Sequence, residues 1–190
     1  MRTGLAAFVI CCVAGVVSAQ EFTTLKGHGG PIMDVSIHPK TGQIATASFD
    51  NSVGLWQDRA PQWLEGHSAA VNTVLYESKT RILSAADDFQ VLAWEPDNGQ
   101  SSPLTQHKGK IVALDVSPDG RWIASASWDG TIGVWDTAAD TARFLKGHDG
   151  GVNDVVFAAN GGAIFSASAD GTIRLWDLNT NEARILVNQG

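Results

Sequence analysis

Short apolar runs, separated by glycine, proline, asparagine and aspartate, fill the chain from about residue 22 onward. In one representative stretch, the partly alternating run Trp122–Ser127 is followed by the pair Asp129-Gly130 and by the run Thr131–Trp135. Alternation over a few residues beside an Asp-Gly pair is typical of a β-hairpin with a tight turn. The pattern therefore predicts an all-β protein made of short strands.

The same unit recurs four times along the chain. Histidines stand at gaps of 39, 40 and 41 residues, and each tryptophan of the unit follows an aspartate by six positions and a hydroxyl residue by ten. The four sets are His28, Thr46, Asp50 and Trp56; His67, Ser84, Asp88 and Trp94; His107, Ser125, Asp129 and Trp135; His148, Ser166, Asp170 and Trp176. A fixed period of about 40 residues is the signature of a repeat architecture.

Each copy predicts four short strands. An apolar pair follows every histidine and marks the first strand: Ile32 and Val35, Val71 and Val74, Ile111 and Leu114, Val152 and Val155. With an outer strand placed before each histidine, the repeats extend over about 22–57, 62–95, 103–136 and 142–177. An additional outer strand is predicted at 183–187, so that the repeat region occupies residues 20–190.

Two dipeptides give the unit a family likeness. Gly-His occurs as Gly27-His28, Gly66-His67 and Gly147-His148, and Trp-Asp occurs as Trp135-Asp136 and Trp176-Asp177. From about Phe22 to its end the chain resembles the WD-repeat β-propeller family. The resemblance implies four-stranded antiparallel blades around a central channel. Four repeats then imply four blades that form a partial propeller or one completed by another chain.

The recurring polar residues also resemble the family pattern. In that pattern the aspartate holds the histidine, the histidine holds the hydroxyl, and the hydroxyl accepts the tryptophan N–H. Such groups, if buried without partners, would each cost about 1–3 kcal/mol, so a closed network stabilises the blade. A Ser-His-Asp hydrolase is the alternative, but it needs one site with an oxyanion hole rather than four equivalent copies. We therefore expect structural networks, no enzyme activity and no cofactor.

The resemblance places partner contacts on one rim of the blades. The positions it indicates are Phe49, Asp87, Trp128, Ala169, Met33, Asn72, Lys110 and Asn153. Large aromatic residues on a rim turn are typical interface anchors, which favours Phe49 and Trp128 as contacts for a protein or peptide. The alternative is that these rings pack on the neighbouring blade.

The number of repeats is small for the family, whose propellers mostly have seven blades. The chain also offers five outer-strand candidates for four sets of three inner strands. Three explanations stay open: the chain is a fragment, it pairs with another copy or chain to complete a ring, or it persists as an open arc whose edge strands favour aggregation.

The N-terminal segment predicts export. Arg2 precedes the uncharged run Gly4–Val17, and small residues follow at Ser18 and Ala19. A positive start, an apolar run and a small-residue exit are typical of a secretory signal peptide, here residues 1–19. The alternative is an uncleaved membrane anchor. We expect a periplasmic location and, after cleavage, no membrane association and no disulfide, because both cysteines lie within this segment.

The net charge of the chain restricts the classes of partner that it can bind. Asp and Glu number 20 against 13 Lys and Arg, a net charge of −7, which argues against a nucleic-acid binder. No two histidines have the spacing of metal ligands, so no metal site is predicted. A non-enzymatic protein-interaction scaffold is the first hypothesis. The alternatives are an accessory or fragment of a periplasmic redox protein of the c-type cytochrome-associated kind, and a propeller that binds a small ligand in its channel.

Overall fold

The computed structural model describes residues 24–57, 60–78 and 81–189, and all the regular structure in these ranges is β-strand. Sixteen strands form four four-stranded antiparallel sheets, which confirms the predicted all-β fold of propeller blades. The predicted signal peptide, residues 1–19, lies outside the described residues. Within the described ranges, no helix has the length and apolar character that crossing a membrane requires.

Each blade is built from four strands that follow one another in the chain and in the sheet. The first blade contains β1 (Ile32–Ile37), β2 (Ile44–Ser48), β3 (Ser52–Gln57) and β4 (Ala60–Glu65). The second contains β5 (Val71–Tyr76), β6 (Ile82–Ala86), β7 (Gln90–Glu95) and β8 (Gln100–Gln106). The third contains β9 (Ile111–Val116), β10 (Trp122–Ser127), β11 (Thr131–Asp136) and β12 (Thr141–Lys146). The fourth contains β13 (Val152–Phe157), β14 (Ala163–Ser168), β15 (Thr172–Asp177) and β16 (Ala183–Asn188).

The outer strands are arranged differently from the sequence expectation. The predicted additional strand 183–187 pairs with β15 as β16 and completes the fourth blade. The first outer-strand candidate begins in the undescribed segment, and its described residues 24–26 belong to no strand. Each blade therefore ends with its outer strand, whereas the predicted repeats begin with it.

A tight turn joins the second and third strands of every blade. The residue after the turn aspartate has a left-handed backbone in each case, with φ of 73° at Asn51, 71° at Phe89, 82° at Gly130 and 79° at Gly171. Glycine adopts this conformation freely and asparagine tolerates it, whereas a bulky residue rarely does. The turn of the second blade is therefore the strained one.

The hydrophobic core lies between the blades. In the first interface, Ala45, Val53 and Leu55 of the first blade pack with Val71 and Val74 of the second. Two further clusters join the second blade to the third and the third to the fourth. In each interface, aliphatic side chains of one blade meet the innermost strand of the next.

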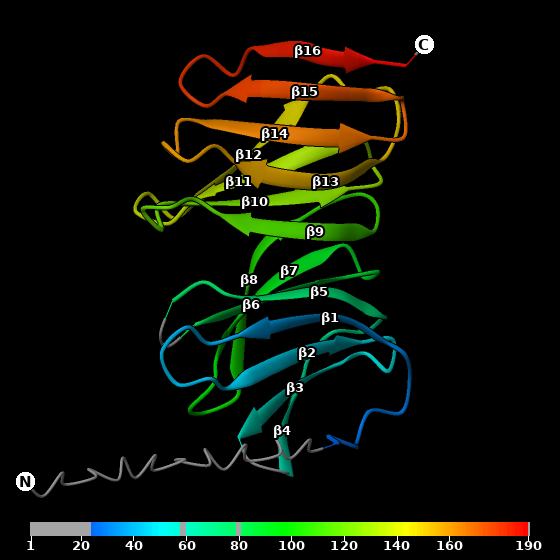
Figure 1. The fold of residues 1–190 in the computed structure, drawn as a ribbon, viewed down its shortest axis with the longest axis vertical. Helices are drawn as coiled ribbons and strands as arrows, with labels where there is room; N and C mark the ends of the chain where they lie inside the picture. The colour runs from blue at the N-terminus through cyan, green and yellow to red at the C-terminus, as the bar shows by residue number, and fades with distance from the viewer. Residues whose placement is uncertain (1–23, 58–59, 79–80, 190) are drawn as a thin grey trace, which may run out of the picture.

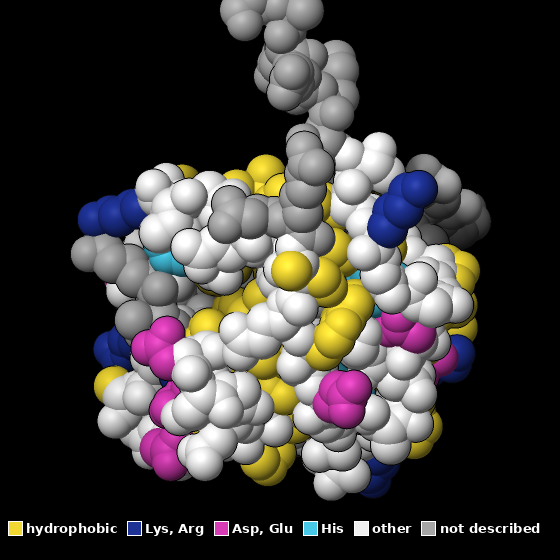
Figure 2. Space-filling view, turned by 90° about the horizontal axis from the view of Figure 1, so that it is seen from below, with side chains coloured by type: hydrophobic (Ala, Val, Ile, Leu, Met, Phe, Trp, Pro, Cys, Tyr) yellow, Lys and Arg dark blue, Asp and Glu magenta, His cyan; other side chains and the backbone are white. Residues whose placement is uncertain are grey.

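The four blades follow one another in a row, with the first and the fourth at its two ends (Figure 1). Neighbouring blades are in contact through their innermost strands: β1 with β5, β5 with β9, and β9 with β13. Seen from the end formed by the first blade, hydrophobic side chains gather near the centre of the surface (Figure 2). Two blades thus have one face that no other blade covers.

Candidate functional site

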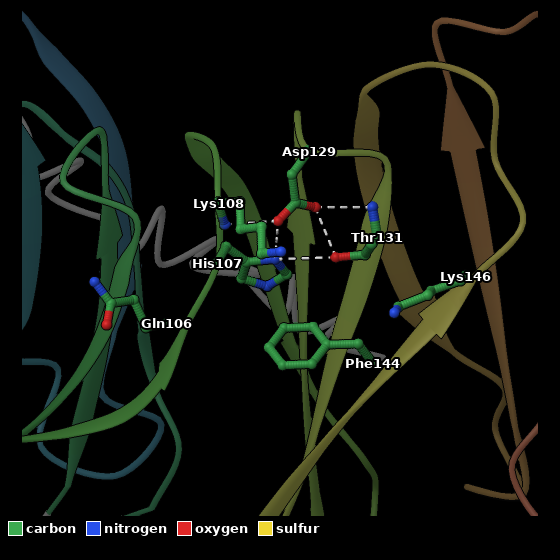
Figure 3. Close-up of a pocket in the computed structure, with 7 residues that line it drawn as sticks. All are labelled: Gln106, His107, Lys108, Asp129, Thr131, Phe144 and Lys146. Carbon is green, nitrogen blue, oxygen red and sulfur yellow. Dashed lines mark hydrogen bonds and ion pairs between the residues drawn. The ribbon is translucent and has the colours of Figure 1, made fainter.

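The recurring histidines and aspartates meet within each blade. Every histidine precedes the innermost strand, and its Nδ1 lies close to one carboxylate oxygen of the turn aspartate, as Figure 3 shows for His107 and Asp129. The Nδ1–Oδ2 distances are 2.9 Å for His28–Asp50, 2.9 Å for His67–Asp88, 3.0 Å for His107–Asp129 and 2.8 Å for His148–Asp170. These contacts connect the loop before the first strand to the turn between the second and third strands.

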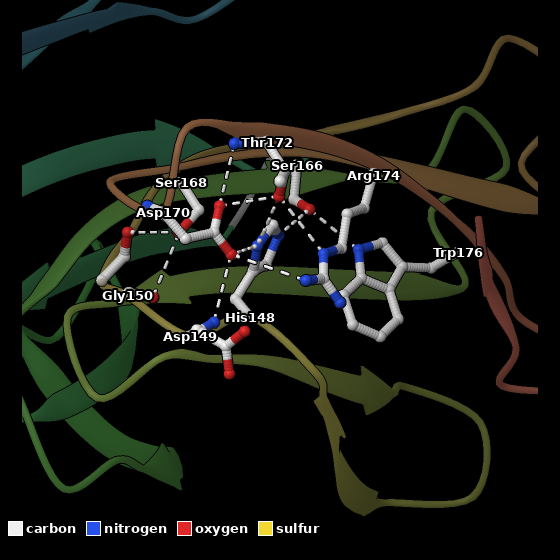
Figure 4. A network of polar contacts seen from close by, with 10 residues as sticks. His148, Asp149, Gly150, Ser166, Ser168, Asp170, Thr172, Arg174 and Trp176 are labelled. Carbon is white, nitrogen blue, oxygen red and sulfur yellow. Dashed lines mark hydrogen bonds and ion pairs between the residues drawn. The ribbon is translucent and has the colours of Figure 1, made fainter. Parts of the chain in front are cut away.

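The other ring nitrogen of each histidine contacts a hydroxyl. The distances from Nε2 are 2.7 Å to Thr46, 2.8 Å to Ser84, 2.8 Å to Ser125 and 2.7 Å to Ser166. In three blades the tryptophan N–H completes the network by donating to the same hydroxyl, at 2.8 Å for Trp56, 2.7 Å for Trp94 and 2.8 Å for Trp176. Figure 4 shows the complete network of the fourth blade.

A single proton arrangement satisfies the whole network. In a neutral histidine, the Nδ1–H donates to the carboxylate and Nε2 accepts the hydroxyl proton. The hydroxyl oxygen is then free to accept the tryptophan N–H. A protonated histidine cannot accept the hydroxyl proton at Nε2, so this arrangement requires the neutral ring.

Burial also favours the neutral form of two of the histidines, His67 and His107. It lowers the pKa of His67 and of His107 below the ordinary value of 6.5, although the neighbouring aspartates, Asp88 and Asp129, act to raise it. Both residues are buried, so the charged form loses hydration that one carboxylate does not replace. The two rings therefore stay neutral at neutral pH.

Three of the turn aspartates, Asp50, Asp129 and Asp170, have a lowered pKa because backbone and hydroxyl groups donate to them. Burial alone would raise the pKa of Asp129, but hydrogen bonds from the Thr131 hydroxyl (2.6 Å) and the Lys108 N–H (2.8 Å) outweigh it and lower the pKa. The pKa of Asp50 and that of Asp170 are lowered by the same balance of burial and hydrogen bonds. Each carboxylate thus holds its turn and its histidine together.

The third blade departs from the expected network. Trp135 makes no hydrogen bond to Ser125 in the part of the chain that the structure describes, so the expected contact is not formed. Its half-buried ring packs instead against the cluster between the second and third blades. The N–H is not among the buried atoms without a partner, which indicates that it reaches solvent. The Trp135 ring is therefore less buried than those of Trp94 and Trp176, so the third blade lacks both the hydrogen bond and the full burial that the tryptophan has in those blades.

A pocket of about 310 Å³ opens beside the same network. Its lining residues are Gln106, His107, Lys108, Asp129, Thr131, Phe144 and Lys146 (Figure 3). The Phe144 ring meets the His107 ring edge-on, with centroids 5.0 Å apart. At the pocket wall His107 Nδ1 and Asp129 Oδ2 are already bonded to each other.

The serines of the networks have a structural role, because they are buried and hydrogen-bonded. The residues Ser84, Ser125 and Ser166 are buried, and each hydroxyl is engaged by a histidine. A nucleophile needs access to a substrate carbonyl and an adjacent oxyanion hole. Among the described residues, no group of three or more His, Cys, Asp or Glu side chains is placed to hold a metal ion.

Half of the predicted rim residues form one cluster. Asp87 accepts a hydrogen bond from Asn72 Nδ2 at 2.9 Å and forms an ion pair with Lys110, whose Nζ lies 5.8 Å from the ring of Trp128. Trp128 is 56% exposed. We call these four residues the rim cluster. The other predicted rim residues, Phe49, Met33, Ala169 and Asn153, are exposed and lie outside it.

Contacts between blades include residues that the sequence reasoning missed. Asp34 Oδ2 accepts the Val74 N–H at 3.0 Å, and Asp115 Oδ2 accepts the Phe157 N–H at 2.6 Å. Each carboxylate thereby joins an innermost strand to the next blade. No repeat register marks them, because Asp34 and Asp115 occupy different positions of their strands.

A family model matches three parts of the repeated sequence. The family model described as "WD domain, G-beta repeat" matches residues 19–57, 99–136 and 140–177. The chain belongs to the WD-repeat family. This confirms the resemblance seen in the Gly-His and Trp-Asp dipeptides. WD-repeat proteins are in general non-enzymatic scaffolds.

Several curated relatives match parts of this WD-repeat chain. Ribosome biogenesis protein YTM1 of Candida glabrata is 32% identical over 117 residues, which cover 50% of the chain and 25% of YTM1. Ribosome assembly protein 4 of Chaetomium thermophilum is 41% identical over 59 residues, 30% of the chain and 11% of that protein. The Notchless protein homolog of Arabidopsis thaliana is 39% identical over 62 residues, 32% of the chain and 13% of that protein. The matches thus span about a quarter or less of these relatives.

These relatives contradict the predicted location. They are fungal and plant proteins, and the first two are named for ribosome biogenesis and ribosome assembly. A periplasm is a bacterial compartment. The prediction of an exported, periplasmic protein is therefore wrong.

Proposed function

We propose that the chain is a non-enzymatic protein-binding platform whose partner contacts the rim cluster. The observation that supports this most directly is the exposed ring of Trp128, held next to the Lys110–Asp87 ion pair. A large aromatic side chain beside a charged pair combines apolar area with directional polar contacts, as interface anchors do. The histidines of the four networks are engaged within the blades. The exposed groups of the rim cluster are therefore the ones that contact the partner.

The surroundings of Trp128 favour a rigid anchor. A side chain on Gly151 would come within 3.2 Å of atoms of Trp128, so the tryptophan lies directly over the backbone of the fourth blade. Asn72 adds support from the other side, because its amide donates to Asp87 and to the carbonyl of Ile111, both at 2.9 Å. An anchor that is ordered before binding loses less conformational entropy when the partner arrives.

The relatives favour a protein partner over a redox or small-ligand role. Names that refer to ribosome biogenesis and ribosome assembly support a platform that joins proteins in a larger particle. The net charge of −7 makes protein surfaces more suitable partners than the nucleic acid of such a particle. The relatives give no support to a role beside a c-type cytochrome.

The test is affinity capture with matched variants. The tagged chain is incubated with lysate, and the proteins that the unaltered chain retains are identified and then titrated with the unaltered chain and with Trp128→Ala. We expect the substitution to weaken binding about 30-fold or more, as for a central aromatic anchor. Ile185→Ala is the control, since Ile185 is 49% exposed but lies on an outer strand. Equal binding by all three chains would contradict the proposal.

A further inference from the structure

The outward surface of the first blade is an unfinished blade interface. Ile32, Val35 and Ile37 of β1 are 54%, 58% and 61% exposed. The counterparts of Ile32 in the other three blades are completely buried by the preceding blade: Val71, Ile111 and Val152. We call the surface of Ile32, Val35 and Ile37 the leading face.

The outward surface of the fourth blade is the other half of such an interface. Ile173 and Val187 are 38% and 42% exposed, and Phe165 beside them is partly exposed. Their counterparts in the first blade, which the second blade covers, are buried to within 1% of complete burial: Ala45, Val53 and Leu64. We call the surface of Phe165, Ile173 and Val187 the trailing face. A pocket of about 200 Å³ is recessed in it beside Phe165 and Ile173.

Each internal interface of the molecule joins these same two kinds of surface. The positions equivalent to the trailing face on one blade pack with the positions equivalent to the leading face on the next, as in the cluster formed by the third and fourth blades. One chain therefore exposes both halves of a contact that it already makes three times. Contact between two such apolar surfaces is favourable, because it removes both of them from water.

We propose that a second copy of this chain covers both faces, with the trailing face of each copy on the leading face of the other. A head-to-tail contact either closes into a ring or continues as a filament. Two copies give eight blades, which is within the range of about 4–8 blades found in propellers, whereas three copies exceed it. The assembly is a closed dimer with two identical contacts.

A polar group of the fourth blade matches the backbone of the first. In the second interface, Asn72 Nδ2 donates to the carbonyl of Ile111 at 2.9 Å. Asn153 is the counterpart of Asn72 and is exposed, and Ile32 is the counterpart of Ile111. In the dimer, Asn153 therefore donates to the Ile32 carbonyl of the second copy.

One pair of charges opposes the contact. Thr73 Oγ1 donates to Asp34 Oδ2 at 2.8 Å across the first interface. In the dimer, Asp154 takes the place of Asp34, and Asp34 of the second copy takes the place of Thr73. Two carboxylates then approach each other, which weakens the dimer. The arrangement thus assigns opposite effects to two neighbouring residues, Asn153 and Asp154.

Sedimentation velocity on the 190-residue chain, at about 1–100 μM, tests the stoichiometry. We expect a concentration-dependent equilibrium between one and two chains that ends at two. A chain that stays monomeric over this range would overturn the proposal, including the case in which another segment of the same chain covers the faces. A continuous series of larger species would overturn the closed ring.

Paired variants test the head-to-tail arrangement. Val35→Asp alters the leading face and Ile173→Asp the trailing face, and either change places a charge in both contacts. We expect each variant alone to dimerise at least about 100-fold more weakly. An equimolar mixture restores one unaltered contact, because the Val35→Asp copy has an intact trailing face and its partner has an intact leading face. We therefore expect heterodimers in the mixture.

Controls keep the test independent of folding. Phe89→Asn removes a side chain that is 38% exposed, as Ile173 is, but that lies on a turn of the second blade. We expect it to dimerise normally, and circular dichroism checks that every variant is folded. If Val35→Asp or Ile173→Asp alone still dimerised fully, its altered face would lie outside the contact and the proposal would be wrong. Asn153→Ala is expected to weaken the dimer about 5-fold and Asp154→Asn to strengthen it by a similar factor, and the reverse signs would contradict the arrangement.

Discussion

The second repeat, residues 62–95, lies outside the family matches, whereas the third repeat lies inside them, yet the second has the more complete tryptophan contact. Trp94 precedes a glutamate and donates to Ser84 at 2.7 Å. Trp135 precedes the aspartate that the family dipeptide requires but makes no such bond to Ser125. Agreement with a family pattern thus identifies the residue, whereas the packing around it decides which contacts form.

The two blades also differ at their turns. Asp129 accepts from the hydroxyl of Thr131 as well as from its N–H, whereas Asp88 accepts only the N–H of Gln90 at this position. The turn of the second blade contains Phe89 in a left-handed conformation, where the third contains a glycine. The second blade thus has the stronger tryptophan contact and the weaker turn.

The largest expected effect is removal of the central histidine. His67→Ala removes the group that connects Asp88 to Ser84, and through Ser84 to Trp94. We therefore expect the free energy of unfolding to fall by about 3 kcal/mol. His107→Ala is expected to cost about 2 kcal/mol, because Asp129 retains the Thr131 hydroxyl and Trp135 is not connected. Urea denaturation of both variants measures the difference. A larger loss for His107→Ala would reverse the comparison.

Acid is expected to weaken both blades in the same pH range. The folded state lowers the pKa of His67 and His107, so the unfolded chain binds protons more tightly and stability falls as the pH drops below about 6.5. The lowered pKa of Asp129 adds a second loss only below about pH 4, its ordinary range. We expect Tm to fall by about 5 °C between pH 7 and pH 5.

Scanning calorimetry over this range measures the pH effect. Replacing His67 or His107 by alanine is expected to flatten the slope by a similar amount, because burial lowers the pKa of both rings. If neither variant changed the slope, other groups would be responsible for the acid sensitivity.

The next effect separates the two tryptophans. Trp94→Phe removes the donor to Ser84 and is expected to cost about 1.5 kcal/mol more than Trp135→Phe, which removes no hydrogen bond within the blade. Trp94 is completely buried and Trp135 is half-buried, so the difference reports on the N–H together with the packing that Trp94→Phe removes from the core. Equal losses in urea denaturation would indicate that the Trp94 bond contributes little.

Much of the architecture could be predicted because the same residues recur at the same spacing in four repeats. The histidine, hydroxyl and aspartate recur at nearly fixed spacing, and the structure brings them together in all four blades. The strands follow from the apolar pairs and the Asp-Gly type turns. What repeats in the sequence can be compared between copies, and this is why it could be identified.

Features that occur once could not be found in this way. The position of the Trp135 ring depends on the cluster between two blades, and no local pattern encodes it. Asp34 and Asp115 accept backbone N–H groups of the following blade from different strand positions, so no period connects them. Likewise, the family resemblance predicts the rim positions, but the contact of Lys110 with both Asp87 and Trp128 depends on two blades being placed side by side.

The smallest expected effect concerns the turn of the second blade. Phe89 has φ of 71°, a conformation that costs a residue with a bulky side chain about 1 kcal/mol and costs glycine little. Phe89→Gly is therefore expected to stabilise the chain by about 0.5–1 kcal/mol in urea denaturation, which would bring the turn closer to that of Gly130. Asn51→Gly, at φ of 73°, is the control and is expected to change stability less, because asparagine already tolerates this conformation. A loss of stability for Phe89→Gly would mean that packing of the partly exposed ring outweighs the backbone strain.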